Sequence, residues 1–178
     1  MKHLIRFCVI CSILLITSCE KKADISTPLT YNEDGIVFSY PGNWEITADN
    51  SKNGVRFFMI TSPGNAYVSI QIYPRQIDLP LKKYVKWFSK RIKKEMPVVK
   101  RIVVNIKDIK DKKNNLQTEG LIEKYSFKIL SFNIPQIAEY YRLEKDNQVA
   151  FLLTNTQEAE SDKVAPGFAL IIKTFTIE

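Results

Sequence analysis

The sequence predicts an α+β domain built on a mainly antiparallel sheet that is covered by helices. Two of the expected strands, Val55–Thr61 and Val149–Leu153, are apolar on both faces. A strand of this kind needs cover on both sides of the sheet. Most connections between the expected strands are of hairpin length, which favours antiparallel pairing. Two helical segments supply the covering layers.

The first strands are short and are separated by turn residues. Ile36–Tyr40 is expected to form a strand that ends at Pro41-Gly42, Val55–Thr61 a second and Ala66–Tyr73 a third. Pro63-Gly64-Asn65 supplies the hairpin turn between the last two. Along the third strand the apolar side chains alternate, which places one set on a single face of the sheet: Ala66, Val68, Ile70 and Ile72.

A helix is expected from Leu81 to Met96. At about 100° per residue its apolar side chains form a single stripe. Pro80 stands at its start and Pro97 just past its end, as at helix boundaries. The members of the stripe are Leu81, Tyr84, Val85, Phe88, Ile92 and Met96.

The second half of the sequence predicts four more strands and a closing helix. The strands are expected at 101–109, 118–130, 137–145 and 149–155, with turns at Asn114-Asn115 and Asp146-Asn147. Pro166 is expected to open the closing helix, which ends near Phe175.

Two short motifs and the order of elements resemble the PsbP-like and Mog1-like superfamily, which includes the DcrB-type bacterial lipoproteins. The motifs are Phe38-Ser39-Tyr40-Pro41-Gly42-Asn43-Trp44 and Ile171-Ile172-Lys173-Thr174-Phe175, where Thr174 replaces the usual serine. The resemblance covers about residues 35–178 and implies an α/β/α sandwich. It implies accessory, assembly or binding roles and offers no catalytic residues. Trp44 itself is expected to fold back onto the core, with stacking on a ligand as the alternative.

The N-terminus has the three parts of a secretory signal. Lys2 and Arg6 form a positive region, Phe7–Ile16 is apolar, and Ile16-Thr17-Ser18-Cys19 resembles a bacterial lipobox. We therefore expect a signal peptide at 1–18, lipid attachment at Cys19, a flexible tether at 19–34 and one domain at 35–178. An ordinary signal peptide or an uncleaved anchor are the alternatives. Glu20, rather than Asp, favours the outer membrane facing the periplasm if the source is Gram-negative.

Processing removes most reactive side chains. His3, Cys8 and Cys11 leave with the signal peptide, and Cys19 becomes acylated, so the mature domain has neither histidine nor free thiol. Triads, cysteine nucleophiles and the usual zinc sites are excluded, and no phosphate-binding glycine loop is present. We expect no cofactor, no metal and no enzymatic activity. Loss of Lys2 and Arg6 lowers the formal charge from +7 to about +5, because 24 basic and 19 acidic residues are left.

One carboxylate is a candidate for an interior site. Strand alternation points Glu123 toward the core, where it would need a partner such as Arg142. A catalytic role, a strand irregularity and a structural ion pair stay open for this residue.

The helix at 81–96 carries a basic face opposite its apolar stripe, with one tryptophan at its edge. A contact with lipid headgroups, a polysaccharide or an acidic protein, anchored by the tryptophan, is the functional hypothesis. A solvated face with the ring lying over lysine stems is the alternative. The residues are Lys82, Lys83, Lys86, Trp87, Lys90, Arg91, Lys93 and Lys94.

The sequence thus predicts a membrane-anchored, non-enzymatic binding or accessory lipoprotein of the bacterial cell envelope. Its expected partners are the membrane, through the N-terminal lipid, and an envelope protein or anionic surface, but no nucleic acid. A small-ligand carrier or a carboxylate-based hydrolase in the periplasm is the alternative, and a protein that shields the cell from a toxin or stress is a third.

Overall fold

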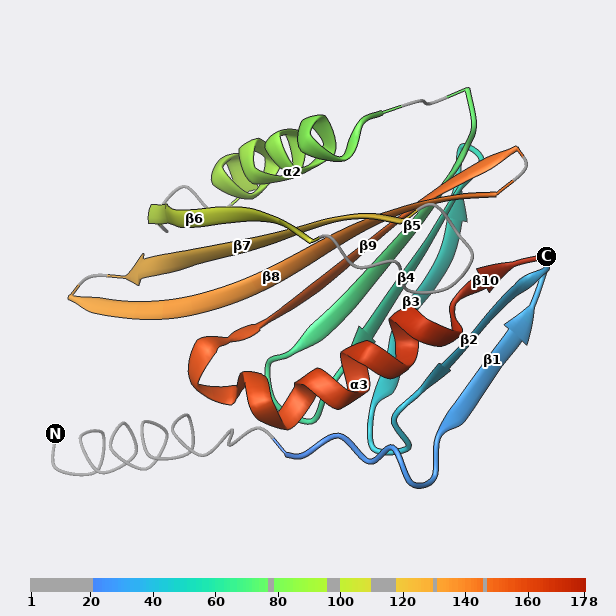
Figure 1. Ribbon diagram of the computed structural model, residues 1–178, viewed down its shortest axis with the longest axis horizontal. Coiled ribbons are helices and arrows are strands. Elements are labelled where there is room, and N and C mark those ends of the chain that lie inside the picture. The colour runs from blue at the N-terminus through green and yellow to red at the C-terminus, as the bar shows by residue number, and fades with distance from the viewer. Residues whose placement is uncertain (1–20, 77–78, 96–99, 110–117, 130, 146) are drawn as a thin grey trace, which may run out of the picture.

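The computed structural model describes residues 21–76, 79–95, 100–109, 118–129, 131–145 and 147–178. In these residues a seven-stranded antiparallel sheet lies between one helix on one face and a second helix with a small three-stranded sheet on the other (Figure 1). The predicted α+β class, with a mainly antiparallel sheet covered by helices on both faces, is confirmed.

The large sheet has the strand order β3-β4-β5-β9-β8-β7-β6. Helix α2 (Leu81–Glu95) and the strands β6, β7 and β8 come between β5 and its neighbour β9 in the chain. Register shifts interrupt both edge strands, at Ile46/Ala48 in β3 and at Val103/Asn105 in β6. Irregular edges of this kind discourage pairing with further strands. The strands are β3 (Glu45–Lys52), β4 (Val55–Thr61), β5 (Tyr67–Pro74), β6 (Lys100–Ile109), β7 (Thr118–Ile129), β8 (Phe132–Lys145) and β9 (Gln148–Gln157).

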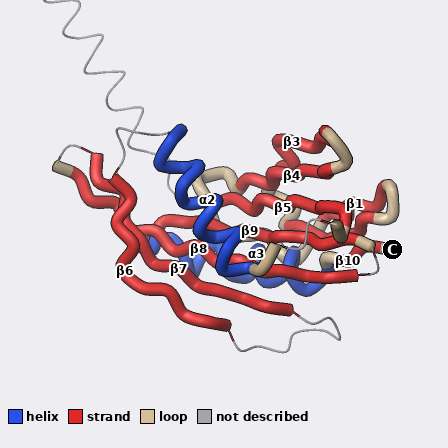
Figure 2. Tube along the Cα trace, turned by 90° about the horizontal axis from the view of Figure 1, so that it is seen from above, coloured by secondary structure: helices blue, strands red, loops and turns tan. Residues whose placement is uncertain are grey.

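The small sheet and α3 form the layer opposite α2. β2 (Ile36–Tyr40) lies between β1 (Leu29–Glu33) and β10 (Thr176–Ile177), and both neighbours are antiparallel to it. A 3-10 turn, η1 (Glu158–Glu160), leads from β9 into α3 (Ser161–Thr174). Seen from above in Figure 2, α2 crosses one face of the large sheet while α3 lies behind it.

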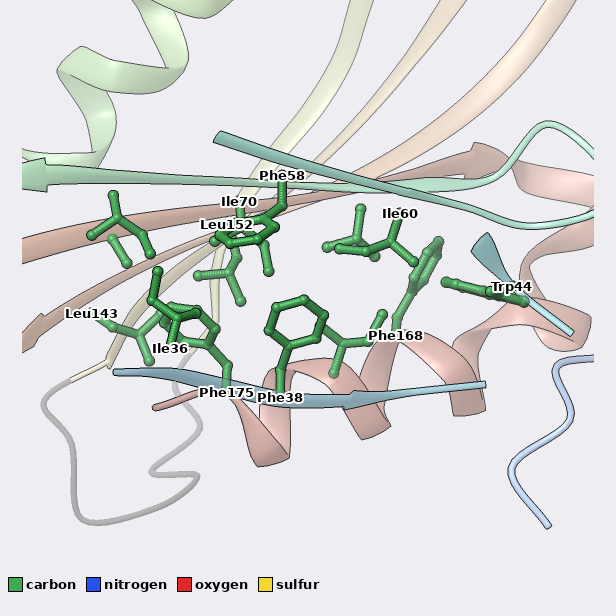
Figure 3. Packing of buried hydrophobic residues seen from close by; sticks show 14 of the residues in the cluster. Ile36, Phe38, Trp44, Phe58, Ile60, Ile70, Leu143, Leu152, Phe168 and Phe175 are labelled. Carbon is green, nitrogen blue, oxygen red and sulfur yellow. The ribbon is translucent and has the colours of Figure 1, made fainter. Parts of the chain in front are cut away.

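Strand β9 separates two hydrophobic cores. Its Ala150 and Leu152 face the α3 layer, while Val149, Phe151 and Leu153 face α2. The core on the α3 side, shown in Figure 3, gathers side chains from β2, β4, β5 and α3 around Phe38 and Phe58. The two-sided burial predicted for β9 is therefore confirmed.

Strand β4 is covered less evenly than its sequence suggests. Phe58 and Ile60 are fully buried in the α3-side core, whereas Phe57 and Met59, on the other face, are only half-buried. The sequence cannot show this difference, because it does not say which strands α2 lies across.

Trp44 folds back onto the core, as predicted. Its side chain is 3% exposed, and its ring packs edge-on against Phe168, with 5.4 Å between centroids. An indole buried to this extent has no free face on which a ligand could stack.

The segment expected to be a tether is instead part of the domain over its described length, residues 21–34. Leu29–Glu33 pairs with β2 along its whole length, and Ala23 is buried in the α3-side core. The polar composition was misleading, because the backbone of this segment makes hydrogen bonds to the domain. The flexible tether at 19–34 is therefore wrong for the described residues.

Two other boundaries differ from the prediction, and two further strands were not predicted. Helix α3 begins at Ser161, so Pro166 lies inside it, where η1 and the buried Val164 and Phe168 hold the first turns in place. β3 and β10 were not predicted, and the expected strand at 137–145 begins earlier, at Phe132. Met96, Asn114-Asn115 and Asp146 lie outside the described residues.

Candidate binding surface on helix α2

Helix α2 is fixed at its start by a proline carbonyl and by three buried side chains. The carbonyl oxygen of Pro80 accepts hydrogen bonds from the backbone N–H groups of Lys83 (2.9 Å) and Tyr84 (3.0 Å). Leu81, Tyr84 and Val85 are each at most 5% exposed. One face of the first two turns is therefore committed to the sheet.

Aromatic stacking sets the rotation of α2 about its axis. The ring of Tyr84 lies flat on Phe151 of β9, with 4.1 Å between centroids and 8° between planes. One turn later, Phe88 meets the edge of Tyr140 of β8 at 6.3 Å. The predicted apolar stripe is confirmed for its described members, and the opposite face of the helix is left to solvent.

The predicted basic face lies on that solvent side. Trp87 is 43% exposed, and the guanidinium carbon of Arg91 lies 5.7 Å from the centre of its ring, within the range of cation–π attraction. The side chain of Lys93 lies outside the described part. The other predicted residues are all exposed: Lys82, Lys83, Lys86, Lys90 and Lys94.

The charge pattern of α2 works against the stability of the helix. It has seven basic residues and one acidic residue, and its first turn holds Lys82 and Lys83 but no carboxylate. Cations near a helix N-terminus oppose the helix dipole, and like charges four residues apart repel, each by a few tenths of a kcal/mol. Lys86 stands in two such pairs, with Lys82 and with Lys90. An acidic partner on this face would relieve the repulsion.

Beneath α2 lies a buried hydroxyl group. The Tyr84 hydroxyl oxygen has no hydrogen-bond partner among the described residues. Burial raises the pKa of Tyr84 far above its usual range, and Tyr73 and Tyr67 nearby add to the effect. The group stays protonated, and its lost hydration counts against the stability of the fold.

Glu123 points into the core, as the strand alternation predicted. It is 1% exposed, and its carboxylate accepts a hydrogen bond of 2.8 Å from the hydroxyl of Tyr140. A carboxylate buried to this extent is closed to a substrate arriving from solution.

Arg142 occupies a different position from the one expected. The strand register sets it opposite Glu119, four residues along β8 from the position opposite Glu123. Its side chain donates to the Leu79 carbonyl oxygen (3.2 Å) and contacts the Glu144 carboxylate. The register sets Ala138 opposite Glu123, and Tyr140, two residues further along β8, reaches Glu123 with its hydroxyl.

Two further features of the described residues bear on function. No group of three or more metal-ligating side chains gathers among them. Neither of the described helices α2 and α3 has the length and apolar composition needed to cross a membrane. Cys19 lies outside the described residues, so the predicted lipid attachment stays a prediction.

The arrangement of strands and helices in this chain is shared with a class of solved structures. No protein-family model matches the sequence, and a search of the curated proteins finds no relative. Among solved structures, cyanobacterial PsbP (CyanoP) from Synechocystis is similar, with a TM-score of 0.55, 14% identity, and coverage of 86% of this chain and 94% of that chain. The Ran-binding protein Mog1p of Saccharomyces cerevisiae is similar too, with a TM-score of 0.51 and 6% identity over 85% of this chain and 95% of its own.

These similarities establish the fold. The chain has the PsbP/Mog1-like fold, which the two sequence motifs predicted. At identities this low, a shared fold does not transfer a partner or an activity.

Proposed function

We propose that this chain is a membrane-anchored, non-enzymatic lipoprotein of the DcrB type that binds or assists an acidic component of the bacterial cell envelope through α2. The observation that carries the proposal is the exposed basic face of α2 with Trp87 at its edge. Exposed aromatic and arginine side chains often anchor protein contacts. Clustered lysines around such an anchor favour an acidic partner.

The proposed location rests on the N-terminal residues. Signal cleavage after Ser18 and acylation of Cys19 would leave the domain attached to a bilayer, facing the periplasm from the outer membrane if the source is Gram-negative. In that compartment nucleic acids are not partners. The acidic component is then an envelope protein or another anionic envelope surface.

The proposal is tested by the association of a soluble form of the chain, starting at Glu20 and lacking the acyl chains, with isolated envelopes of the source bacterium. We expect association that weakens as salt rises, because the Debye length falls from about 8 Å at physiological ionic strength to about 3 Å at 1 M. The double variant Lys86→Glu/Lys90→Glu should bind several-fold more weakly. Trp87→Ala should bind more weakly at every salt concentration.

The control makes the same change in net charge elsewhere. Lys52→Glu/Lys128→Glu alters two exposed lysines on β3 and β7, and it should bind like the parent. Equal loss in both double variants would show that net charge alone drives the association, and the proposal would then be wrong. Protease treatment of the envelopes separates the two kinds of partner, because only a protein partner is destroyed.

A further inference from the structure

The residues that follow the expected lipidation site are docked on the domain as a strap, here defined as Lys22–Pro28. Asn43 holds it through two contacts, since its side-chain amide donates to the Lys22 carbonyl oxygen (3.0 Å) and its side-chain oxygen accepts from the Asp24 N–H (2.9 Å). The Ala23 N–H donates to the Lys163 carbonyl oxygen, and the Gly42 N–H to that of Asp24, each at 2.9 Å. The strap is thus fixed to α3 on one side and to the turn before β3 on the other.

The strap also has internal order. The Asp24 carboxylate accepts hydrogen bonds from the Ser26 hydroxyl (2.6 Å), the Ser26 N–H (3.0 Å) and the Thr27 hydroxyl (2.7 Å). These bonds, those from Ser26 first, lower the pKa of Asp24 to about 2. The fit against the domain is tight, since a Cβ atom at Gly42 would lie only 2.3 Å from the Thr27 carbonyl oxygen.

Docking of the strap shortens the reach between lipid and domain. Two residues lie between Cys19 and Lys22, so the Cα atoms of Cys19 and Lys22 are at most about 11 Å apart. A free segment from Cys19 to Gly35 could extend to roughly 50 Å at most. Because the polar region on each side of a bilayer is only about 6 Å thick, an acylated Cys19 would bring the strap to the membrane surface.

Two exposed apolar side chains and two exposed lysines lie on the strap and beside it. Ile25 is 51% exposed, and Leu29, which follows the strap, is 47% exposed. Lys21 and Lys22, also exposed, precede them in the chain. Apolar side chains beside lysines are typical of surfaces that lie in the interfacial region of a bilayer.

The basic face of α2 lies on the other side of the molecule. The strap contacts the α3 layer, and the two core clusters place α3 and α2 on opposite faces of the large sheet. In Figure 1 the strap lies at the bottom beside α3, while α2 lies across the sheet at the top. A bilayer that meets the strap therefore leaves the outer side of α2 facing away from it.

We infer that the strap holds the lipidated domain against its own membrane in one orientation, with Ile25 in the headgroup region and the basic face of α2 turned away. This inference rests on the acylation of Cys19 in the proposed function. It identifies the partner of α2 further, as an acidic component reached from the aqueous side and not the membrane that carries the protein.

The test uses the full lipoprotein, processed in bacteria and reconstituted into phosphatidylcholine vesicles, whose zwitterionic surface does not attract the lysines of α2. Single cysteines introduced by Ile25→Cys and Lys90→Cys carry an environment-sensitive fluorophore, and the mature chain offers no competing thiol. We expect iodide in the water to quench the label at position 25 several-fold less than the label at position 90. A nitroxide in the lipid headgroup region should quench them in the reverse order.

Insertion of ten Gly-Ser residues between Glu20 and Lys21 tests whether the short reach sets the orientation. The inserted linker should raise iodide quenching at position 25 toward that at position 90. Asn43→Ala, which releases two of the strap contacts, should do so in part, whereas Asn133→Ala, at the exposed start of β8, should not.

The outcomes separate the two proposals. Vesicle flotation of the protein, together with acylated Cys19 in its mass spectrum, supports the anchoring. Flotation with equal iodide quenching at positions 25 and 90 overturns the orientation and leaves the anchoring intact. Absence of the acyl chains would overturn both the anchoring and the orientation. The envelope binding of α2 is measured on the soluble form, so that result would not be affected.

Discussion

Replacement of Gly167 by alanine tests the packing that holds the strap to α3. Gly167 is buried on the face of α3 that meets the N-terminal segment. A Cβ atom there would lie 2.8 Å from Pro41 Cγ, 2.8 Å from Trp44 Cζ2 and 3.0 Å from Ala23 Cβ. None of these three atoms is the end of a flexible side chain, so the segment or the tryptophan must move.

Two opposing effects set the magnitude. Alanine in place of glycine inside a helix gains about 1 kcal/mol from helix propensity. Overpacking of a tight site costs about 1–3 kcal/mol, and contacts with three rigid groups place Gly167→Ala toward the upper end. We expect a net loss of about 1–2 kcal/mol, which lowers Tm by roughly 5 °C for a domain of this size.

The assay is urea and thermal unfolding of the soluble form that starts at Glu20, together with hydrogen exchange of the strap amides. Ala169→Gly, at an exposed position of the same helix, measures the propensity effect alone and should cost about 1 kcal/mol. A Gly167→Ala variant that is more stable than the parent, with unchanged exchange at Ala23 and Asp24, would falsify the packing of the strap against α3.

Further outcomes follow from four single side chains. Tyr84→Phe removes a buried hydroxyl that has no hydrogen-bond partner among the described residues, and it should stabilise the fold by about 1 kcal/mol in urea unfolding. Tyr140→Phe takes a donor from the Glu123 carboxylate and should cost about 2 kcal/mol in the same assay. Thr174→Val should cost about 1–2 kcal/mol and Thr174→Ser much less, because the Thr174 hydroxyl accepts from the Ser39 N–H and donates to the Leu170 carbonyl oxygen, both at 2.8 Å. The folded-state pKa of Asp24, about 2, lies below its usual 3.8, so its contribution is present above that value and is lost as pH falls toward 2. The protection of the strap amides, taken relative to their intrinsic exchange rates at each pH, should fall over this range, and Asp24→Asn should remove this pH dependence.

The elements with strong periodicity could be predicted from the sequence. The apolar stripe of α2 and the two-sided burial of β9 follow from side-chain spacing, and their positions agree with the structure within a few residues. Glu123 was placed inside for the same reason. The exposure of Trp87 followed from its angle on the helix, because it lies outside the stripe. Spacing along one element is thus enough to assign its faces.

Two kinds of feature were not predicted. The strands β1 and β3 are joined to their neighbours by turns that the sequence does signal, whereas the docking of the strap depends on contacts between distant residues. Asp34-Gly35 and Asn53-Gly54 adopt positive φ angles at the tight turns of β1–β2 and β3–β4. Dipeptides of this kind are strong hairpin signals, so β1 and β3 were within reach of the sequence. Docking of the strap was not, because it depends on the side chain of Asn43 and the backbone of Lys163, which no local pattern joins to residues 22–24.

The hydrogen-bond donor to Glu123 likewise depends on a contact between distant residues, which spacing along one strand does not predict. Alternation gives the face of a strand but not its register, and a shift in register changes which residue lies opposite. Tyr140 donates to Glu123 because β8 pairs with β7 in the register that sets Ala138 opposite Glu123. Arg142 was the expected partner because opposite charge suggests pairing, and charge alone carries no information about position along a strand.

The two proposed contact surfaces should act independently. Trp87 lies on the solvent side of α2, and Gly167 lies in α3, on the other side of the large sheet. The described contacts give them no shared partner, and substitutions at separated sites usually add within about 0.5 kcal/mol. We therefore expect the unfolding free energies of Trp87→Ala and Gly167→Ala to add in the double variant. Gly167→Ala should also leave envelope association of the soluble form unchanged. A coupling larger than about 1 kcal/mol would show that the sheet transmits strain between its faces, so that membrane contact at the strap would alter binding at α2.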